Sequence, residues 1–174
     1  MGIATLEPLN GQPYRQVGKT VFTSAMANMA STVCVVTAEC AGFCPGRTVT
    51  AMLSLSAEPP LILVSIQTGC ALADTIMAGK GFSLAMLAEG QEMVADAFAG
   101  KVAPDKRYLM GVWEWWLSGR PRLFGSAVSL DCELEGAMPI ADHTLFAGRV
   151  VAADIAAFRA PLLWHQRGYG KLQR

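Results

Sequence analysis

The segment GRTVTAMLSLSAEPP, residues 46–60, decides the fold of this chain because a regular alternation of side chains runs through it to a double proline. Successive side chains of an extended strand leave on opposite faces. One face would carry Thr48, Thr50, Ser54 and Ser56, and the other Val49, Leu53 and Leu55. Such alternation is typical of an ordinary half-buried strand. If the hydroxyl face lined a pocket, it would suit a phosphate and the carbonyl edge of a flat heterocycle.

Length and composition predict one domain and small-molecule partners. We assign the domain to residues 19–174, after an N-terminal arm over residues 1–18 that a partner subunit could order. Hydrophobic residues make up 52% and charged residues only 16%, which favours further buried surface in a homodimer. Lysine plus arginine equals aspartate plus glutamate at 14 each, so there is no electrostatic footprint for nucleic acid or anionic lipid.

The apolar runs and the N-terminal residues indicate the cellular compartment, and the cysteine spacing indicates whether a metal site is expected. No apolar run approaches the roughly 20 residues of a membrane helix, and the first residues lack a basic stretch followed by an apolar one. We therefore expect a soluble, cytoplasmic protein. The odd number of cysteines without paired CxxC spacing fits reduced thiols. Cys40 and Cys44 with a histidine could hold a metal, but four ligands at zinc-finger spacing are absent, and we predict no metal site.

The periodicity predicts more strands than helices. A helix is expected over residues 21–29, with its methionines in the core. Further helices are expected at 71–78 and from 90, and strands at 32–38, 46–60, 61–67, 82–87, 128–134, 144–152 and 162–164. Most connections are too short for helical crossovers, which predicts a mainly β fold, a closed antiparallel barrel with peripheral helices. Without GxGxxG, P-loop or GxSxG motifs, a Rossmann fold, an NTPase and an α/β-hydrolase are disfavoured.

Two further places could contribute to a site. After the strand at 61–67, a glycine turn leads into a helix N-terminus, where an anion would sit. The cluster of Trp113, Trp115 and Trp116 could cover a pocket, although burial in a core or an interface is the commoner role of such residues.

Four pieces, taken in order, carry a family resemblance. They are MASTVCVVTA at 29–38, GRTVTAMLSLSAEPPLILVSIQTGCAL at 46–72, FAG at 98–100 with Arg107-Tyr108 downstream, and ADHTLFAGRV at 141–150. Together they resemble the short-chain flavin reductases, which include the reductase components of two-component flavin monooxygenases. The likeness runs from about Val21 to Leu172. It implies a closed Greek-key split β-barrel that binds FMN.

The resemblance also implies where a flavin, FMN or FAD, would lie. The ring and ribityl chain would follow Arg47, Thr48, Val49, Thr50, Ala51 and Ser54, and the phosphate would be held by Gln67, Thr68, Gly69, Cys70 and Ala71. The phosphate position agrees with the glycine turn and helix start inferred from the residues themselves.

The stretch Ala141-Asp142-His143 matches the family pattern Gly-Asp-His. His143 then takes the place of the histidine beside the nicotinamide, and Asp142 would orient its imidazole. The alternative is a histidine that only fixes the start of a strand. Three residues depart from the family pattern: Ala141 for a glycine, Cys70 for a serine that donates to phosphate, and Arg47 for an apolar residue.

We therefore predict an NAD(P)H:flavin oxidoreductase that passes a hydride from NADH or NADPH to FMN or FAD and supplies reduced flavin to a partner monooxygenase. The alternative, which Ala141 favours, is a non-catalytic FMN-binding or storage protein on the same barrel. A related split-barrel oxidase acting on a pyridoxal-type phosphate would want a basic phosphate cage that the sequence lacks.

Overall fold

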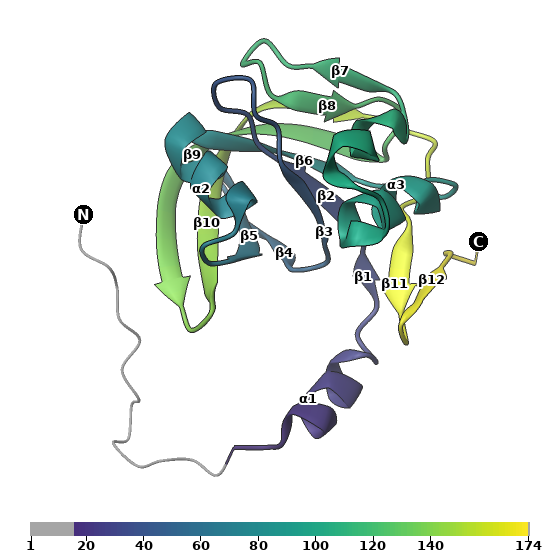
Figure 1. Cartoon of the computed structure of the whole chain (residues 1–174). Coiled ribbons are helices and arrows are strands. Elements are labelled where there is room, and N and C mark those ends of the chain that lie inside the picture. The colour runs from purple at the N-terminus through teal and green to yellow at the C-terminus, as the bar shows by residue number, and fades with distance from the viewer. Residues whose placement is uncertain (1–15, 174) are drawn as a thin grey trace.

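The computed structural model describes residues 16–173, so most of the predicted arm, residues 1–15, lies outside the described residues. Figure 1 shows a curled sheet with helices around it. The helical elements are α1 (Lys19–Met26), α2 (Ala71–Gly79), α3 (Glu92–Asp96), the π-helical turn η1 (Ala97–Lys101) and the 3₁₀ segment η2 (Pro104–Leu109). The strands are β1 (Ser31–Thr32), β2 (Cys34–Thr37), β3 (Gly46–Val49), β4 (Met52–Ala57), β5 (Pro60–Gln67), β6 (Gly81–Met86), β7 (Trp113–Trp115), β8 (Pro121–Leu123), β9 (Val128–Ile140), β10 (His143–Ile155), β11 (Leu163–His165) and β12 (Gly168–Gly170).

Seven strands form one antiparallel sheet in the order β3-β2-β6-β9-β10-β5-β4. The prediction of a mainly β fold is confirmed, but the prediction of a closed barrel is not, because β3 and β4 stay at the two edges and no strand pair joins them within residues 16–173. Two residues, Thr50 and Ala51, link these edges in the chain. The sheet is thus a half-barrel whose opening is spanned by the chain rather than by a hydrogen-bonded ladder.

The predicted strand over 46–60 is interrupted in its middle. The Met52 amide donates to the Thr50 carbonyl at 3.0 Å, and the Ser65 amide donates to the Ala51 carbonyl at 3.0 Å. These bonds bend the chain between β3, which pairs with β2, and β4, which pairs with β5. A register shift at Ser54 and Ser56 also breaks the regular alternation along β4.

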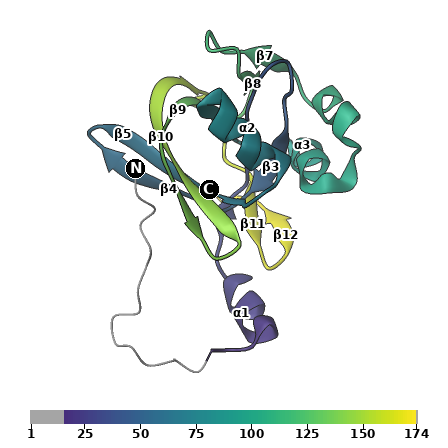
Figure 2. The ribbon, with the colours of Figure 1, turned by 60° about the vertical axis from the view of Figure 1, so that its left-hand side comes forward.

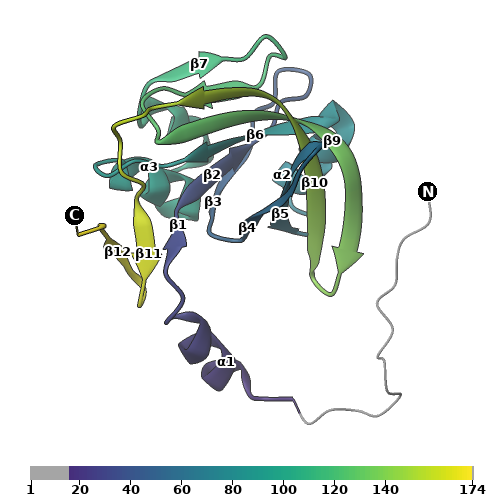
Figure 3. The ribbon, with the colours of Figure 1, turned by 180° about the vertical axis from the view of Figure 1, so that it is seen from behind.

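The longest strands, β9 and β10, form a hairpin that curves around one side of the molecule (Figure 3). Register shifts between Ala147 and Gly148 and between Val150 and Ala152 give this hairpin its bend. Helix α2 lies beside the hairpin in Figure 2. The far end of the hairpin, the two-residue turn at Ala141 and Asp142, is anchored to the body because the Thr68 amide donates to the Asp142 carbonyl at 3.0 Å.

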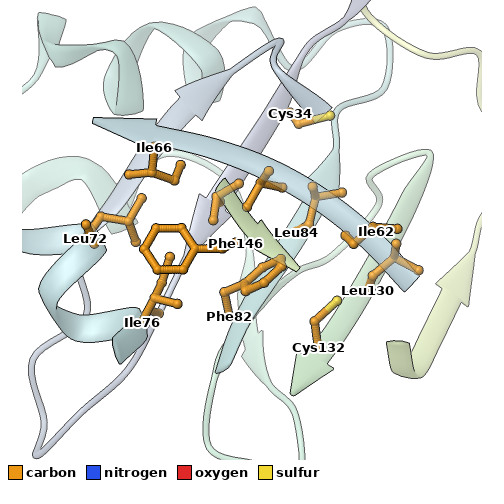
Figure 4. Close-up of a cluster of buried hydrophobic side chains, with 14 residues drawn as sticks. Cys34, Ile62, Ile66, Leu72, Ile76, Phe82, Leu84, Leu130, Cys132 and Phe146 are labelled. Atoms are coloured by element: carbon orange, nitrogen blue, oxygen red, sulfur yellow. The ribbon is translucent and has the colours of Figure 1, made fainter. Parts of the chain in front are cut away.

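The main core cluster joins α2 to the strands of the seven-stranded sheet (Figure 4). Its largest fully buried side chains include Phe82, Phe146, Ile66 and Ile76, so α2 covers one end of the sheet through its apolar face. A second apolar cluster joins α3, η1 and the sheet of β1, β11 and β12 to the other side of β2 and β6.

Helix α1 forms where helical spacing predicted it but buries nothing. None of its residues is buried, and Phe22 and Met26 are exposed, so the expectation of a methionine stripe in the core is wrong for this helix. Figures 1 and 3 show α1 standing apart from the sheet. The amphipathic pattern therefore predicted the helix correctly, but its apolar face is exposed among the described residues.

The tryptophan cluster divides between burial and exposure. Trp113 packs against the rings of Phe98 and Tyr108, with centroids 5.3 and 4.9 Å apart, and the Trp116 indole N–H donates to the Ser83 hydroxyl at 3.0 Å. These two serve packing, whereas Trp115 is exposed at the end of β7. Among residues 16–173, every helix is too short or too polar to cross a membrane.

Candidate active site

A pocket of about 290 Å³ lies at the opening between the two sheet edges. It is lined by Arg47, Thr48, Val49, Thr50 and Ala51, by Ser65, Ile66 and Gln67 of β5, and by His143 of β10. The fold thus brings seven of the predicted site residues to one place. The antiparallel pairing explains the meeting, because His143 is directly opposite Gln67 in the ladder of β10 and β5.

Strand β3 offers backbone groups to this pocket. It pairs with β2 on one side only, so its other edge faces the pocket with N–H and C=O groups that no strand uses within residues 16–173. The Thr48 side chain contributes differently from the prediction, since its hydroxyl donates to the Ala95 carbonyl at 2.6 Å. A Cβ at Gly46 would come within 2.6 Å of the Phe98 ring, so only glycine lets β3 pack this closely on η1.

His143 and Asp142 form a pair at the tip of the hairpin. The His143 Nδ1 lies 2.9 Å from Asp142 Oδ1, and this hydrogen bond from the imidazole lowers the pKa of the Asp142 carboxyl. Because Nδ1 is engaged by the carboxylate, Nε2 is the ring nitrogen that a bound molecule can contact. Both side chains are exposed, so the pair can meet a ligand without moving a covering segment.

The turn that carries this pair has an unusual residue. Ala141 has a φ of 52°, in the left-handed region that glycine adopts without a steric penalty. The predicted glycine-to-alanine departure therefore falls at a position where the backbone itself favours glycine.

The predicted phosphate residues lie around the start of α2 but not in one pocket. Cys70 is the N-cap residue of α2 and packs against the core, and its side chain makes no capping hydrogen bond. Ala71, the first helical residue, lines a neighbouring pocket of about 520 Å³ together with Gly46 and Arg107. Thr68 and Gly69 line a third hollow beside α2, and the Thr68 hydroxyl shares a 2.9 Å hydrogen bond with Thr144.

Ser54 is the predicted residue that the structure does not bring to the site. It pairs with Ile62 in the ladder of β4 and β5, it is exposed, and it lines neither the 290 Å³ pocket nor its neighbours.

Sequence reasoning missed the residues on the other side of β3. Thr48, Val49 and Thr50 also border a hollow of about 220 Å³ that is lined by Asp96, Lys101, Trp164 and Tyr169. Asp96 accepts a hydrogen bond from the Tyr169 hydroxyl at 2.6 Å and lies 2.9 Å from the Lys101 ammonium, and these contacts lower the pKa of its carboxyl. Nothing in the local pattern joins residues 96, 101 and 169; only the tertiary fold does.

Within residues 16–173, no three His, Cys, Asp or Glu side chains gather as a metal site would require. Burial raises the pKa of the Tyr108 hydroxyl, which makes no hydrogen bond, and it also raises the pKa of the nearby Cys44 thiol. Both groups are therefore neutral beside Arg107 in the 520 Å³ pocket.

Comparison with known proteins gives consistent matches along most of the chain. Residues 26–173 match the family described as flavin reductase like domain. The chain is 34% identical over 163 residues to the reductase component of FADH(2)-dependent resorcinol hydroxylase from a Rhizobium species, covering 92% of this chain and 90% of that protein. It is 30% identical over 156 residues to the FMN reductase (NADH) RutF of Klebsiella pneumoniae, covering 90% and 95%. The solved structure of the flavin reductase PheA2 superposes with a TM-score of 0.82 at 29% identity, covering 91% of this chain and all of that one.

Proposed function

Because this chain belongs to the flavin reductase family, we propose that it transfers a hydride from NADH to FMN or FAD and that the pocket between β3 and β10 is where this happens. The observation that carries the proposal is the meeting of Thr50, Gln67 and His143 around one pocket that also exposes the free edge of β3. A flavin, when bound, supplies the hydride-accepting chemistry.

The residues of the pocket fit a flavin. The N–H and C=O groups on the unpaired edge of β3, together with the N–H groups of Thr50 and Ala51, match the donors and acceptors on the edge of an isoalloxazine ring. The carbonyls of Thr50 and Ala51 are already engaged by the amides of Met52 and Ser65. The N–H donors of this edge would stabilise the negative charge that a reduced flavin carries near N1 and the C2 carbonyl. The Thr48 hydroxyl is engaged with Ala95, so we assign Thr48 a backbone role.

The phosphate end of the flavin would lie between β3 and the start of α2. Ala71 and Gly46 meet there, and Arg107 adds a cation that is held by hydrogen bonds to the carbonyls of Val102 and Gly46. A guanidinium and a helix N-terminus both favour a phosphate group. In this proposal, Arg107 is therefore added to the predicted phosphate residues. Ser54 is removed from the residues predicted to contact the ring and ribityl chain.

His143 would position the nicotinamide and Asp142 would hold His143. The hydrogen bond at Nδ1 fixes the orientation of the imidazole, which leaves Nε2 to contact the dinucleotide. Alignment of the two rings within contact distance is the main contribution that the protein makes to a hydride transfer.

We further propose that the chain acts as a homodimer and delivers reduced flavin to a separate oxygenase. Exposed apolar residues of α1 (Val21, Phe22 and Met26) and of β4 (Leu53 and Leu55) support the first part. Leu53 and Met29 border a hollow beside Thr50 and Ala51, so the subunit interface would adjoin the pocket. The naming of the Rhizobium relative as a reductase component supports the second part.

The test is nicotinamide oxidation with His143→Ala, with His165→Ala as the matched control because His165 is an exposed histidine outside the pocket. We expect His143→Ala to lower kcat about 10- to 100-fold, with a change in flavin Kd of less than about threefold. The control should retain wild-type turnover. A wild-type protein that oxidises NADH no faster than free flavin, while retaining FMN through gel filtration, would instead establish the storage function.

A further inference from the structure

The proposed hydride transfer leaves a groove of about 590 Å³ beside α2 without a role. One wall is the face of α2 that carries Asp74, Met77 and Lys80, and the other wall is the hairpin of β9 and β10. The groove follows α2, whose nine residues span about 13 Å. It is therefore long enough for a flat ring with a sugar and a phosphate attached.

The floor of the groove is apolar and partly bare. Ala137 and Pro139 of β9 line it, and Met77 of α2 is 44% exposed on its other wall. Ala137 is exposed and lies directly opposite Phe146 in the ladder of β9 and β10, so its side chain is on the face of the hairpin that lines the groove. The small methyl group at this position leaves the floor of the groove open.

The groove begins where the proposed flavin site ends. Gln67 and His143 line the first pocket, and the next residues, Thr68 and Thr144, line the groove. Neighbouring residues of a strand face opposite sides of the sheet, so the two hollows lie on opposite faces and meet around the end of β5. The passage there is Gly69, where an added Cβ would again meet nothing within 4 Å.

Polar groups flank the apolar floor. Asp74 lies on the wall near the passage, and Lys80 lies at the other end of α2. Glu135 also lines the groove, but its charge is matched by Arg149, whose guanidinium lies 2.8 Å away. An exposed carboxylate such as that of Asp74 accepts hydrogen bonds from ribose hydroxyls, and a flat apolar wall accepts a purine.

We propose that this groove binds the adenylate half of a dinucleotide substrate. The inference rests on the proposed function, since the phosphate position at the start of α2 is what directs the rest of a dinucleotide toward Gly69. In this arrangement the adenine lies on Met77, Ala137 and Pro139, and the Asp74 carboxylate accepts from the ribose. Two substrates of the reaction contain adenylate, FAD and NADH, whereas FMN and reduced nicotinamide mononucleotide lack it.

The test fills the groove with Ala137→Leu and measures four KM values: FAD and FMN with NADH fixed, and NADH and reduced nicotinamide mononucleotide with FMN fixed. The matched control is Glu133→Leu, which adds the same side chain at an exposed position of β9 outside the groove. Circular dichroism tests whether both variants fold, and gel filtration tests whether they keep the wild-type oligomeric state.

A rise of about tenfold in the KM ratio of FAD to FMN for Ala137→Leu, with the control unchanged, would place the adenylate of the flavin in the groove. The same rise in the ratio of NADH to its mononucleotide would place the adenylate of the nicotinamide there. The proposal is overturned if neither ratio moves, or if Ala137→Leu changes the oligomeric state and thereby shows that a second copy fills the groove. A wild-type protein without any flavin reduction would overturn the proposed function instead, and equilibrium dialysis of FAD against FMN would still test the groove.

Discussion

Strands β3 and β4 are separated by two residues and carry the same alternating pattern, yet they are covered very differently. Strand β3 is partly buried, packs its glycine on Phe98 and borders the candidate pocket. Strand β4 is exposed along most of its length, with Leu53 at 48% and Leu55 at 49% exposure. The alternating pattern of a strand therefore specifies which face is apolar, whereas the tertiary and subunit contacts determine what covers that face. If β3 is covered by its own chain and β4 is covered by a second copy of the chain, changes in the two strands should have different effects.

The largest effect is expected from Leu53→Asp. In a twofold dimer the change occurs twice, and the loss of two buried leucines would cost about 4 kcal/mol, roughly a thousandfold in the dimer dissociation constant. Analytical ultracentrifugation measures this directly. Ser54→Asp places the same charge on the other face of β4 and should leave the dimer intact. A Leu53→Asp protein that stays dimeric would remove β4 from the interface.

Gly46→Val tests the intramolecular side of the comparison. The new side chain would overlap the Phe98 ring and the Thr37 methyl group, so unfolding in urea should show a loss of about 3 kcal/mol. Ala57→Val makes a comparable addition at an exposed position of β4 and should change the free energy of unfolding by less than about 0.5 kcal/mol. Equal effects at the two positions would contradict the assignment of β3 to the core.

Thr48→Val sharpens the same contrast at the level of one hydrogen bond. The valine keeps the shape of the side chain but leaves the Ala95 carbonyl without the hydroxyl donor, which should cost about 1 kcal/mol of stability. The matched change on β4 is Ser56→Ala, since the Ser56 hydroxyl only accepts a 3.2 Å bond from the Glu58 amide at an exposed turn. Its effect should be smaller. If Thr48→Val weakened flavin binding more than stability, the hydroxyl would have a ligand role after all.

The smallest expected effect is a pH dependence of stability that arises from Asp96, which lines the hollow bordered by β3. Hydrogen bonds from Tyr169 and Lys101 lower the pKa of the Asp96 carboxyl in the folded state. Its stabilising contribution is therefore present above the unfolded pKa of about 4 and is lost as the pH falls through the folded value. Unfolding measured between pH 6 and 3 should show a shallower acid loss for Asp96→Asn than for wild type. Glu58→Gln, beyond the end of β4, should keep the wild-type slope.

The sequence predicted the positions of the helices and strands better than it predicted which of their faces are buried. Helix 71–78 and the strands at 61–67 and 82–87 appear within two residues of the expected positions because their periodicity is local. The break at Thr50 and Ala51 was missed, because the side-chain pattern continues through it while backbone bonds to β5 bend the chain. Closure was predicted wrongly, because local patterns do not specify whether two edge strands pair.

The family resemblance predicted distant residues that border one pocket in the structure, and the role of that pocket in flavin binding stays a prediction. That resemblance supplied His143 and Thr50, which are 93 residues apart in the sequence and border one pocket in the structure. It did not reveal that Thr48 turns its hydroxyl to Ala95 or that Ser54 lies outside the pocket. Both outcomes depend on packing against η1 and on the register shift in β4, which are tertiary properties.

The short link between the two sheet edges has a consequence for how such a protein can diversify. Residues inserted between Val49 and Met52 would break no strand pair, because neither Thr50 nor Ala51 belongs to a ladder. The mouth of the pocket can therefore be lengthened or reshaped while every ladder of the scaffold keeps its register. Variation in substrate preference among proteins of this architecture is then expected to concentrate at this seam, where changing the chain disturbs the framework least.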